Sequence, residues 1–449
     1  MSILKSIVKI TISLCFAAST HALKIEITQG EFRPEPIALP SFSGNSDLKA
    51  IGNDILSVVG TDLEGCGLFE QVSSSQFPQD GDLLAAKGPQ FRDWKAATSA
   101  RYLLSGCIKE EGAKIVVEFR LYDVVAEREI DRGLSFSCEK SKWRRLAHSI
   151  ADEIYFRIHK ETGYFNTQIV FVETVAKGKN PIKTLVRMDQ DGENPEKLVN
   201  SKGLLLTPRY APDGKSIAYL DLSKNKAQVY IMDLKTKARD LLGNFEGMNF
   251  APRFSPDGTQ VVMSIEKGGK SAIYLYSLTS KKLTRLTEHR SIDTSPCFSP
   301  DGKEIVFTSD RDAEGGEQIY IMDTNGGNLR RVTFARGKYS QPVWSSRGDL
   351  IAFTKQIEGQ FYIGVVNLDG SGERLIAQGY LVEGAEWAKP IPQRSTDKGR
   401  PAARYLIFSK ETTSGAPSQI YRVDLTGRHM QLLKTPKDAS DCTWSPPLS

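Results

Sequence analysis

Acidic side chains recur in this sequence at a fixed spacing, an arrangement that could build a metal site. Asp213, Asp257 and Asp301 each stand in a P-D-G sequence, 44 residues apart. Calcium needs several oxygen ligands at about 2.3–2.6 Å, and carboxylates on separate repeated units lie too far apart to share one ion. A turn is favoured, because Pro fixes φ, Ser and Asp side chains bond the local backbone, and Gly accepts a left-handed conformation.

Sequence motifs for catalysis are missing. The chain has no G-x-S-x-G, H-E-x-x-H or G-x-G-x-x-G motif and no complete Walker motif. Beyond residue 22 it has four histidines, none at metal-ligand spacing: His148, His159, His289 and His429. We therefore expect no catalytic residues, no metal and no other cofactor. A secreted, hydrolase-like enzyme is the alternative to a binding function.

The first 22 residues are typical of a secretory signal. Lys5 and Lys9 flank a short apolar run that ends in small residues, too short to span a bilayer. Their removal takes the formal net charge from +5 to +3, too small an excess to indicate nucleic acid. We expect a periplasmic monomer, without membrane insertion and without nucleic acid.

Five cysteines follow the signal. An oxidising compartment permits disulfides, but an odd number leaves at least one thiol free. Cys107 and Cys138 lie on strands expected to be neighbours, so a disulfide between them is possible.

A repeat organises the second part of the chain. Each copy opens with an aromatic residue, and the copies containing Phe254 and Phe298 read F-S-P-D-G. An alternating apolar run, a polar loop and two further apolar runs follow, which is the pattern of four short strands per blade of a β-propeller. The opening aromatics are Tyr210, Phe254, Phe298, Trp344, Trp387 and Trp444.

The last copy stops after its first strand. Its missing strands occur at the start of the region, within residues 168–172, 183–189 and 196–199. The C-terminal strand should therefore complete that blade and close a six-bladed ring without an open sheet edge. The expected fold is an N-terminal α/β domain (residues 23–162) followed by an all-β six-bladed propeller (residues 163–449).

The N-terminal region lacks the repeat and mixes helix with strand. Helical spacing of apolar residues predicts helices over 47–64 and 143–159, with Gly163 as a cap for the second. Strands are expected over 24–28, 36–40, 100–108, 115–121 and 130–138.

A propeller gathers the loops that precede its innermost strands around one end of the central channel. These loops hold mixed polar and aromatic residues, which suit a peptide or protein partner. They span residues 246–251, 291–295, 338–341, 383–386 and 438–441.

These features together resemble the TolB family of the Tol-Pal system of Gram-negative bacteria. The resemblance rests on the signal, the opening I-E-I-T-Q-G and P-I-A-L-P-S-F, the α/β region, the repeats and the final T-W-S-P. It implies a non-enzymatic adaptor that links the lipoprotein Pal to the inner-membrane protein TolA. The family maintains envelope integrity and assists outer-membrane constriction at division.

Transferred by position, the resemblance implies two binding segments. The Pal-facing residues would be Met248, Asn249, Asp293, Thr294, Ser295, Ser340 and Gln341. The TolA-facing segment would run from Leu23 to Phe32 and begin with Leu23, Lys24, Ile25, Glu26, Ile27 and Thr28. Family members often carry His where Met248 stands, and the insertion at 389–401 is unusual.

Overall fold

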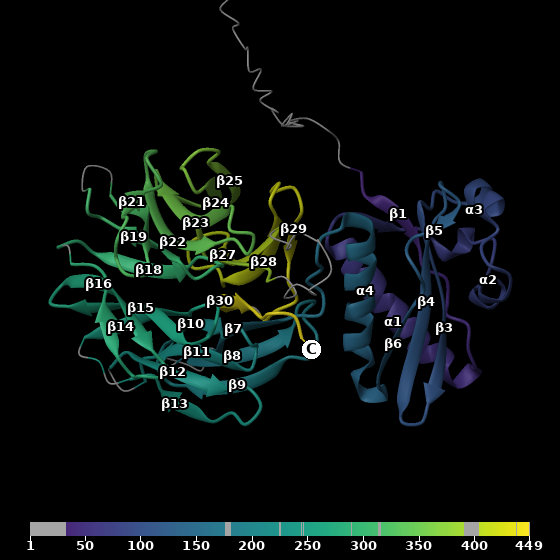
Figure 1. Cartoon of the computed structure of the whole chain (residues 1–449), viewed down its shortest axis with the longest axis horizontal. Helices are drawn as coiled ribbons and strands as arrows, with labels where there is room; N and C mark the ends of the chain where they lie inside the picture. The colour runs from purple at the N-terminus through teal and green to yellow at the C-terminus, as the bar shows by residue number, and fades with distance from the viewer. Residues whose placement is uncertain are drawn as a thin grey trace, which may run out of the picture.

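The computed structural model describes residues 33–448 except 176–180, 224–225, 244, 246, 289, 313–315, 390–403 and 437. It shows an α/β domain beside a β-propeller (Figure 1). The expected strand over 24–28 and the TolA-facing segment lie outside the described residues.

The α/β domain is a mixed sheet covered by two long helices. The sheet order is β2-β1-β3-β4-β5, and β6 also pairs with β4. Helices α1 and α4 stand between this sheet and the propeller (Figure 1). The bounds are β1 Glu35–Ala38, α1 Ser46–Gly65, β2 Phe69–Gln71, α2 Gly81–Lys87, α3 Phe91–Ala97, β3 Tyr102–Glu111, β4 Lys114–Asp123, β5 Arg128–Glu129, β6 Leu134–Glu139 and α4 Trp143–His159, with 3-10 turns at Ser74–Gln76 and Lys140–Lys142.

The two long helices follow from their apolar periodicity, and both are confirmed. The predicted cap of α4 is wrong: the helix ends at Lys160, which adopts the left-handed conformation (φ 55°) three residues before Gly163. Lys160 N donates to Phe156 O at 2.8 Å, so the turn closes without glycine.

A disulfide between Cys107 and Cys138 is also contradicted. Strand β4 lies between the strands that carry the two cysteines. In the strand register, Cys107 stands opposite Glu118 of β4, and Cys138 stands opposite Ile115 of β4. Because these β4 positions differ by an odd number, the two thiols point to opposite faces of the sheet. All five cysteines that the structure describes are free.

The propeller has six blades of four antiparallel strands, as predicted. The last blade has the order β30-β7-β8-β9, so the C-terminal strand closes the ring against the first propeller strand. The blades are β10 Leu205–Tyr210, β11 Ser216–Asp221, β12 Gln228–Asp233 and β13 Arg239–Leu241; β14 Met248–Phe254, β15 Gln260–Lys267, β16 Lys270–Ser277 and β17 Leu283–Arg285; β18 Asp293–Phe298, β19 Glu304–Ser309, β20 Gln318–Asp323 and β21 Arg330–Arg331; β22 Lys338–Trp344, β23 Leu350–Ile357, β24 Gln360–Asn367 and β25 Arg374–Gly379; β26 Leu381–Trp387, β27 Tyr405–Glu411, β28 Gln419–Asp424 and β29 Met430–Leu432; and β30 Ala439–Trp444, β7 Gln168–Val175, β8 Ile182–Asp189 and β9 Glu196–Ser201.

The S-P-D-G sequences form turns. Gly258 has φ 72°, and its N–H donates to Ser255 O at 2.9 Å. Asp257 accepts the Ser255 hydroxyl at 2.5 Å and Thr259 N at 3.0 Å. These hydrogen bonds, with that from Ser255 first in effect, lower the pKa of Asp257. The repeated aspartate therefore serves its own turn.

The two domains share one apolar core. Residues of α1 and α4 belong to the same buried cluster as Tyr405 and Trp444 of the propeller. Asp152 of α4 fixes the connecting segment, because its carboxylate accepts Phe165 N at 2.8 Å and Asn166 N at 3.0 Å.

We expect Asp152→Asn to lower the free energy of unfolding by about 1–3 kcal/mol. The amide keeps one acceptor and turns an N–H₂ group toward the other buried donor. Equilibrium denaturation by urea measures the change, with the exposed Asp54→Asn on α1 as control. Equal stability of the two variants would contradict this role for Asp152.

Candidate binding surface at the mouth of the propeller

The innermost strand of every blade carries the same irregularity. Strands β10, β14, β18, β22, β26 and β30 contact one another in order around the ring. In each, the pairing register shifts two or three residues before the opening aromatic. At each shift one residue has a left-handed backbone: Thr207, Ala251, Ser295, Gln341, Gly384 and Asp441, with φ between 46° and 69°.

These six bulges are costly, since five of them use a residue other than glycine. A left-handed non-glycine residue costs about 1–3 kcal/mol and persists where the surrounding fold imposes it. A bulge also re-aims the side chains beside it. The bulges therefore give the six strands a shared, irregular end.

Burial marks the same residues. The left-handed residue and the residue before it are partly exposed in every blade, while the residue that follows is buried. We call this set the mouth ring: Leu206, Thr207, Phe250, Ala251, Thr294, Ser295, Ser340, Gln341, Glu383, Gly384, Ser440 and Asp441. It is a closed circle of varied side chains with solvent access.

The structure brings together four of the predicted Pal-facing residues. Thr294, Ser295, Ser340 and Gln341 are all members of the mouth ring. Met248 and Asn249 are the first two residues of β14, and their backbones pair with those of Glu266 and Ile265. Only the backbone of these two residues is described.

Asp293 lies below the surface. Its side chain is fully buried and accepts Arg311 Nη2 at 3.0 and 3.1 Å and the Ser291 hydroxyl at 2.9 Å. Arg311 in turn stacks over Phe307 and Tyr320. Asp293 thus positions the loop that carries Thr294 and has no free oxygen for a partner.

Hydrogen bonds between neighbouring blades link the ring at two places. Gln341 Oε1 accepts Gly384 N at 2.8 Å, and Asp441 Oδ1 accepts Thr207 N at 3.3 Å. In both cases a side chain from one bulge satisfies the backbone of the bulge in the next blade. The mouth ring is therefore pre-organised rather than a set of independent loops.

In four blades, those of β10, β14, β26 and β30, none of the ring residues is among the predicted Pal-facing residues. Glu383, Ser440 and Asp441 stand in loops that were named, but their strands have Ala385 and Cys442 where the other blades have proline. Leu206 and Thr207 directly precede the strand proline Pro208, and this position in the sequence could have identified them as residues of the mouth.

Glu383 gives the mouth ring a charge that changes near neutral pH. Burial, with smaller effects from Asp441 and Glu411, raises the pKa of Glu383 to about 7. The folded protein therefore holds a proton that the unfolded chain, with a pKa near 4.5, has released. Stability should fall as pH rises through this window, because the unfolded state then binds fewer protons than the folded state.

We expect Glu383→Gln to be more stable than the parent protein at pH 8, by roughly 1–3 kcal/mol. The gain should fade at pH 5, where Glu383 is protonated in the folded state. Denaturant unfolding at both pH values measures it, with the exposed Glu110→Gln as control. A gain that is the same at both pH values would contradict the assigned cause.

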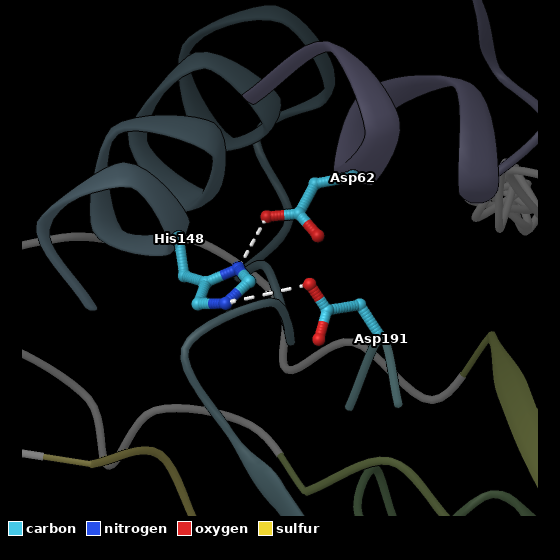
Figure 2. Close-up of side chains that lie close together, drawn as sticks. All are labelled: Asp62, His148 and Asp191. Carbon is cyan, nitrogen blue, oxygen red and sulfur yellow. Dashed lines mark hydrogen bonds and ion pairs between the residues drawn. The ribbon is translucent and has the colours of Figure 1, made fainter. Parts of the chain in front are cut away.

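A second polar cluster joins the two domains. His148 of α4 lies between Asp62 of α1 and Asp191 of the β8–β9 turn (Figure 2). Its Nδ1 is 2.6 Å from Asp62 Oδ2, and its Nε2 is 3.8 Å from Asp191 Oδ2. Burial alone would lower the pKa of His148, but Asp62, Asp191 and Asp189 together raise it.

The same three residues have ligand atoms within 4.8 Å of one another, so we considered a metal ion. Arg144 pairs with Asp191, and Gln190 Nε2 donates to the second oxygen of Asp62 at 2.7 Å. Hydrogen-bond donors therefore occupy both carboxylates, and Arg144 adds a positive charge beside them. The cluster is therefore a hydrogen-bonded link between domains, and its residues do not fit a metal.

The fold and the mouth ring define a β-propeller protein that carries an α/β domain and presents one pre-organised, non-repetitive surface. The sequence matches models of the TolB amino-terminal domain over residues 23–130 and of the TolB beta propeller domain over residues 155–448. The chain belongs to the TolB family, which confirms the resemblance found in the sequence.

Curated relatives and a solved structure support the same family. A Tol-Pal system protein TolB of Gluconobacter oxydans (strain 621H) is 39% identical over 438 residues, 96% of this chain and 90% of the relative. Another, from Paramagnetospirillum magneticum (strain ATCC 700264 / AMB-1), is 47% identical over 224 residues, 49% of each chain. The crystal structure of TolB from Acinetobacter baumannii superimposes with a TM-score of 0.79 at 26% identity, covering 92% of this chain and 97% of that one.

Proposed function

We propose that this protein is a periplasmic, non-enzymatic adaptor of the Tol-Pal system that binds the lipoprotein Pal at the mouth ring. The observation that carries the proposal is the ring itself: twelve partly exposed residues on six irregular strand ends, five of them strained and four of them joined in two hydrogen-bonded pairs. Strain that the fold retains at one surface is a reason to look for function there. Membership of the TolB family supplies the system in which the partner is sought.

The second contact is proposed for the segment after the signal. We infer that residues 23–32 engage TolA, so that one molecule connects the inner-membrane complex to Pal and to peptidoglycan. This connection would maintain envelope integrity and assist constriction at division. No helix among the described residues has the length and apolar character needed to cross a membrane.

A hydrolase that uses the channel is not favoured. Glu386 is a buried carboxylate on the innermost strand β26, and Arg253 Nη1 lies 2.9 Å from its Oε2. Burial would raise the pKa of Glu386, but Arg253 and Arg209 outweigh it and lower the pKa. A carboxyl kept ionised in this way is a poor general acid.

Calorimetric titration of the protein, without residues 1–22, with lipid-free Pal and with the periplasmic part of TolA tests the proposal. We expect saturable binding of both, and loss of TolA binding alone when residues 23–32 are also deleted. Ser340→Arg should weaken Pal binding alone, whereas Ser280→Arg, an exposed matched control on a β16–β17 turn, should not. Absence of Pal binding, or equal binding by both Arg variants, would refute the assigned surface.

A further inference from the structure

Below the mouth ring, the innermost strands carry a second set of equivalent residues. Each stands one place before the opening aromatic and pairs with the second strand of its blade in the same register. We call this set the channel ring. Its members are Arg209, Arg253, Cys297, Val343, Glu386 and Thr443.

Two members of the channel ring bridge the channel. Arg253 is in the blade of β14 and Glu386 is in the blade of β26, which is three positions away in a ring of six. These blades face each other, so the 2.9 Å contact from Arg253 Nη1 to Glu386 Oε2 spans the channel. Because the channel is narrow enough for an ion pair between opposite blades, Arg209, the other charged member of the channel ring, also lies near this pair.

Positive charge exceeds negative charge around the channel ring. Arg209 Nε is 3.7 Å from Glu386 Oε2, too far for a hydrogen bond, and its Nη1 donates to Pro208 O at 2.7 Å. Lys389, two residues after β26, is partly exposed and also acts on Glu386. Two arginines therefore lie beside one carboxylate, and Lys389 adds a third positive charge that acts on it.

The other titratable groups nearby do not correct this imbalance. Asp441 of the mouth ring acts on Arg209, but burial raises the pKa of Asp441 and disfavours its charge. Burial raises the pKa of the Cys442 thiol, and Cys297 is buried beside Arg253. Burial and the neighbouring cations lower the pKa of both Arg209 and Lys389.

Solvent reaches the excess charge. The side chains of Arg209 and Arg253 are 12% and 14% exposed, whereas Glu386 is 4% exposed. Buried charges are normally paired, and an arginine fork matches carboxylate and phosphate oxygens. The site thus has the access, the charge and the donors that an anion requires.

We propose that the propeller channel binds a small oxyanion, a carboxylate or a phosphate, between Arg209, Arg253 and Lys389. The oxyanion would accept hydrogen bonds from Arg209 and Lys389 on the side away from Glu386. Its source is either a free anion or an acidic side chain of a protein bound at the mouth. The site itself does not depend on the proposed function.

Calorimetric titration of the protein with inorganic phosphate, at low ionic strength with chloride as the other anion, tests the site. Arg209→Gln and Lys389→Gln keep the Arg253–Glu386 pair and should each weaken phosphate binding at least about tenfold. Glu386→Gln removes the competing carboxylate and should tighten binding, an effect of opposite sign that simple loss of structure would not produce. The matched control is Arg374→Gln, an exposed arginine of the outer strand β25.

Thermal unfolding of each variant confirms that it is folded before the titrations are compared. Unchanged binding by Arg209→Gln and Lys389→Gln, or an equal loss in Arg374→Gln, would show an adventitious ion only and overturn the proposal.

A titration of the Pal-saturated protein with phosphate separates the two sources of the oxyanion, and this experiment alone rests on the proposed function. Lost phosphate binding assigns the site to a side chain of the partner, and retained binding assigns it to a free anion.

Discussion

If Pal binds at the mouth ring, we expect Thr294→Arg to reduce the affinity for Pal by at least about 100-fold, or roughly 3 kcal/mol. Thr294 is partly exposed, and its position is fixed by the fully buried Asp293, which is paired with Arg311, on one side and by the left-handed Ser295 on the other. The backbone therefore has little freedom to withdraw the new side chain. A long cation placed there would occupy the space that the partner must fill.

Calorimetric titration with lipid-free Pal measures this loss. Thr279→Arg is the matched control, because Thr279 is exposed on the turn between β16 and β17. It adds the same charge to the neighbouring blade, away from the mouth. Pal binding by Thr294→Arg that equals the binding by this control would remove Thr294 from the interface.

We expect Arg422→Met to lower the free energy of unfolding by about 3–5 kcal/mol and to loosen the contact between the domains. Arg422 of β28 is buried, and its guanidinium donates to Gln190 Oε1, Gly65 O and Gln431 Oε1, each at 2.7 Å. Gly65 ends α1, so one side chain holds the α/β domain to the propeller. Methionine keeps the apolar stem and leaves three acceptors, one buried and two partly buried, without a charged donor.

Urea denaturation measures the loss of stability, and small-angle scattering detects a larger radius of gyration if the domains separate. Arg374→Met, on an exposed outer strand, should change neither quantity. A stability loss below about 1 kcal/mol, with an unchanged radius, would show that the apolar core alone holds the domains together.

Periodicity in the sequence predicted the propeller because each blade repeats the same local pattern. The 44-residue interval from Tyr210 to Phe254 and the isolated strand before Trp444 were sufficient to expect six blades and a closing strand. Helices α2 and α3 were not predicted. Each has seven residues, too few turns for apolar spacing to be distinctive.

The candidate site was predictable in position and less so in detail. The place of Ser340 and Gln341 before a strand proline located them at the mouth. The same rule could not show that Asp293 is buried against Arg311, because that pairing depends on the fold of the blade. The link between Asp62 and His148 joins residues 86 positions apart, and no local pattern marks such a pair.

Site-specific photocrosslinking in living cells tests the adaptor account most directly. A photoreactive amino acid at Ser340, in the mouth ring, is compared with the same residue at Ser280, on the exposed β16–β17 turn. Binding of Pal at the mouth ring predicts a covalent adduct with Pal from position 340 and none from position 280. Adducts with Pal from position 280 alone, or from neither position while both proteins are present, would contradict binding at the mouth.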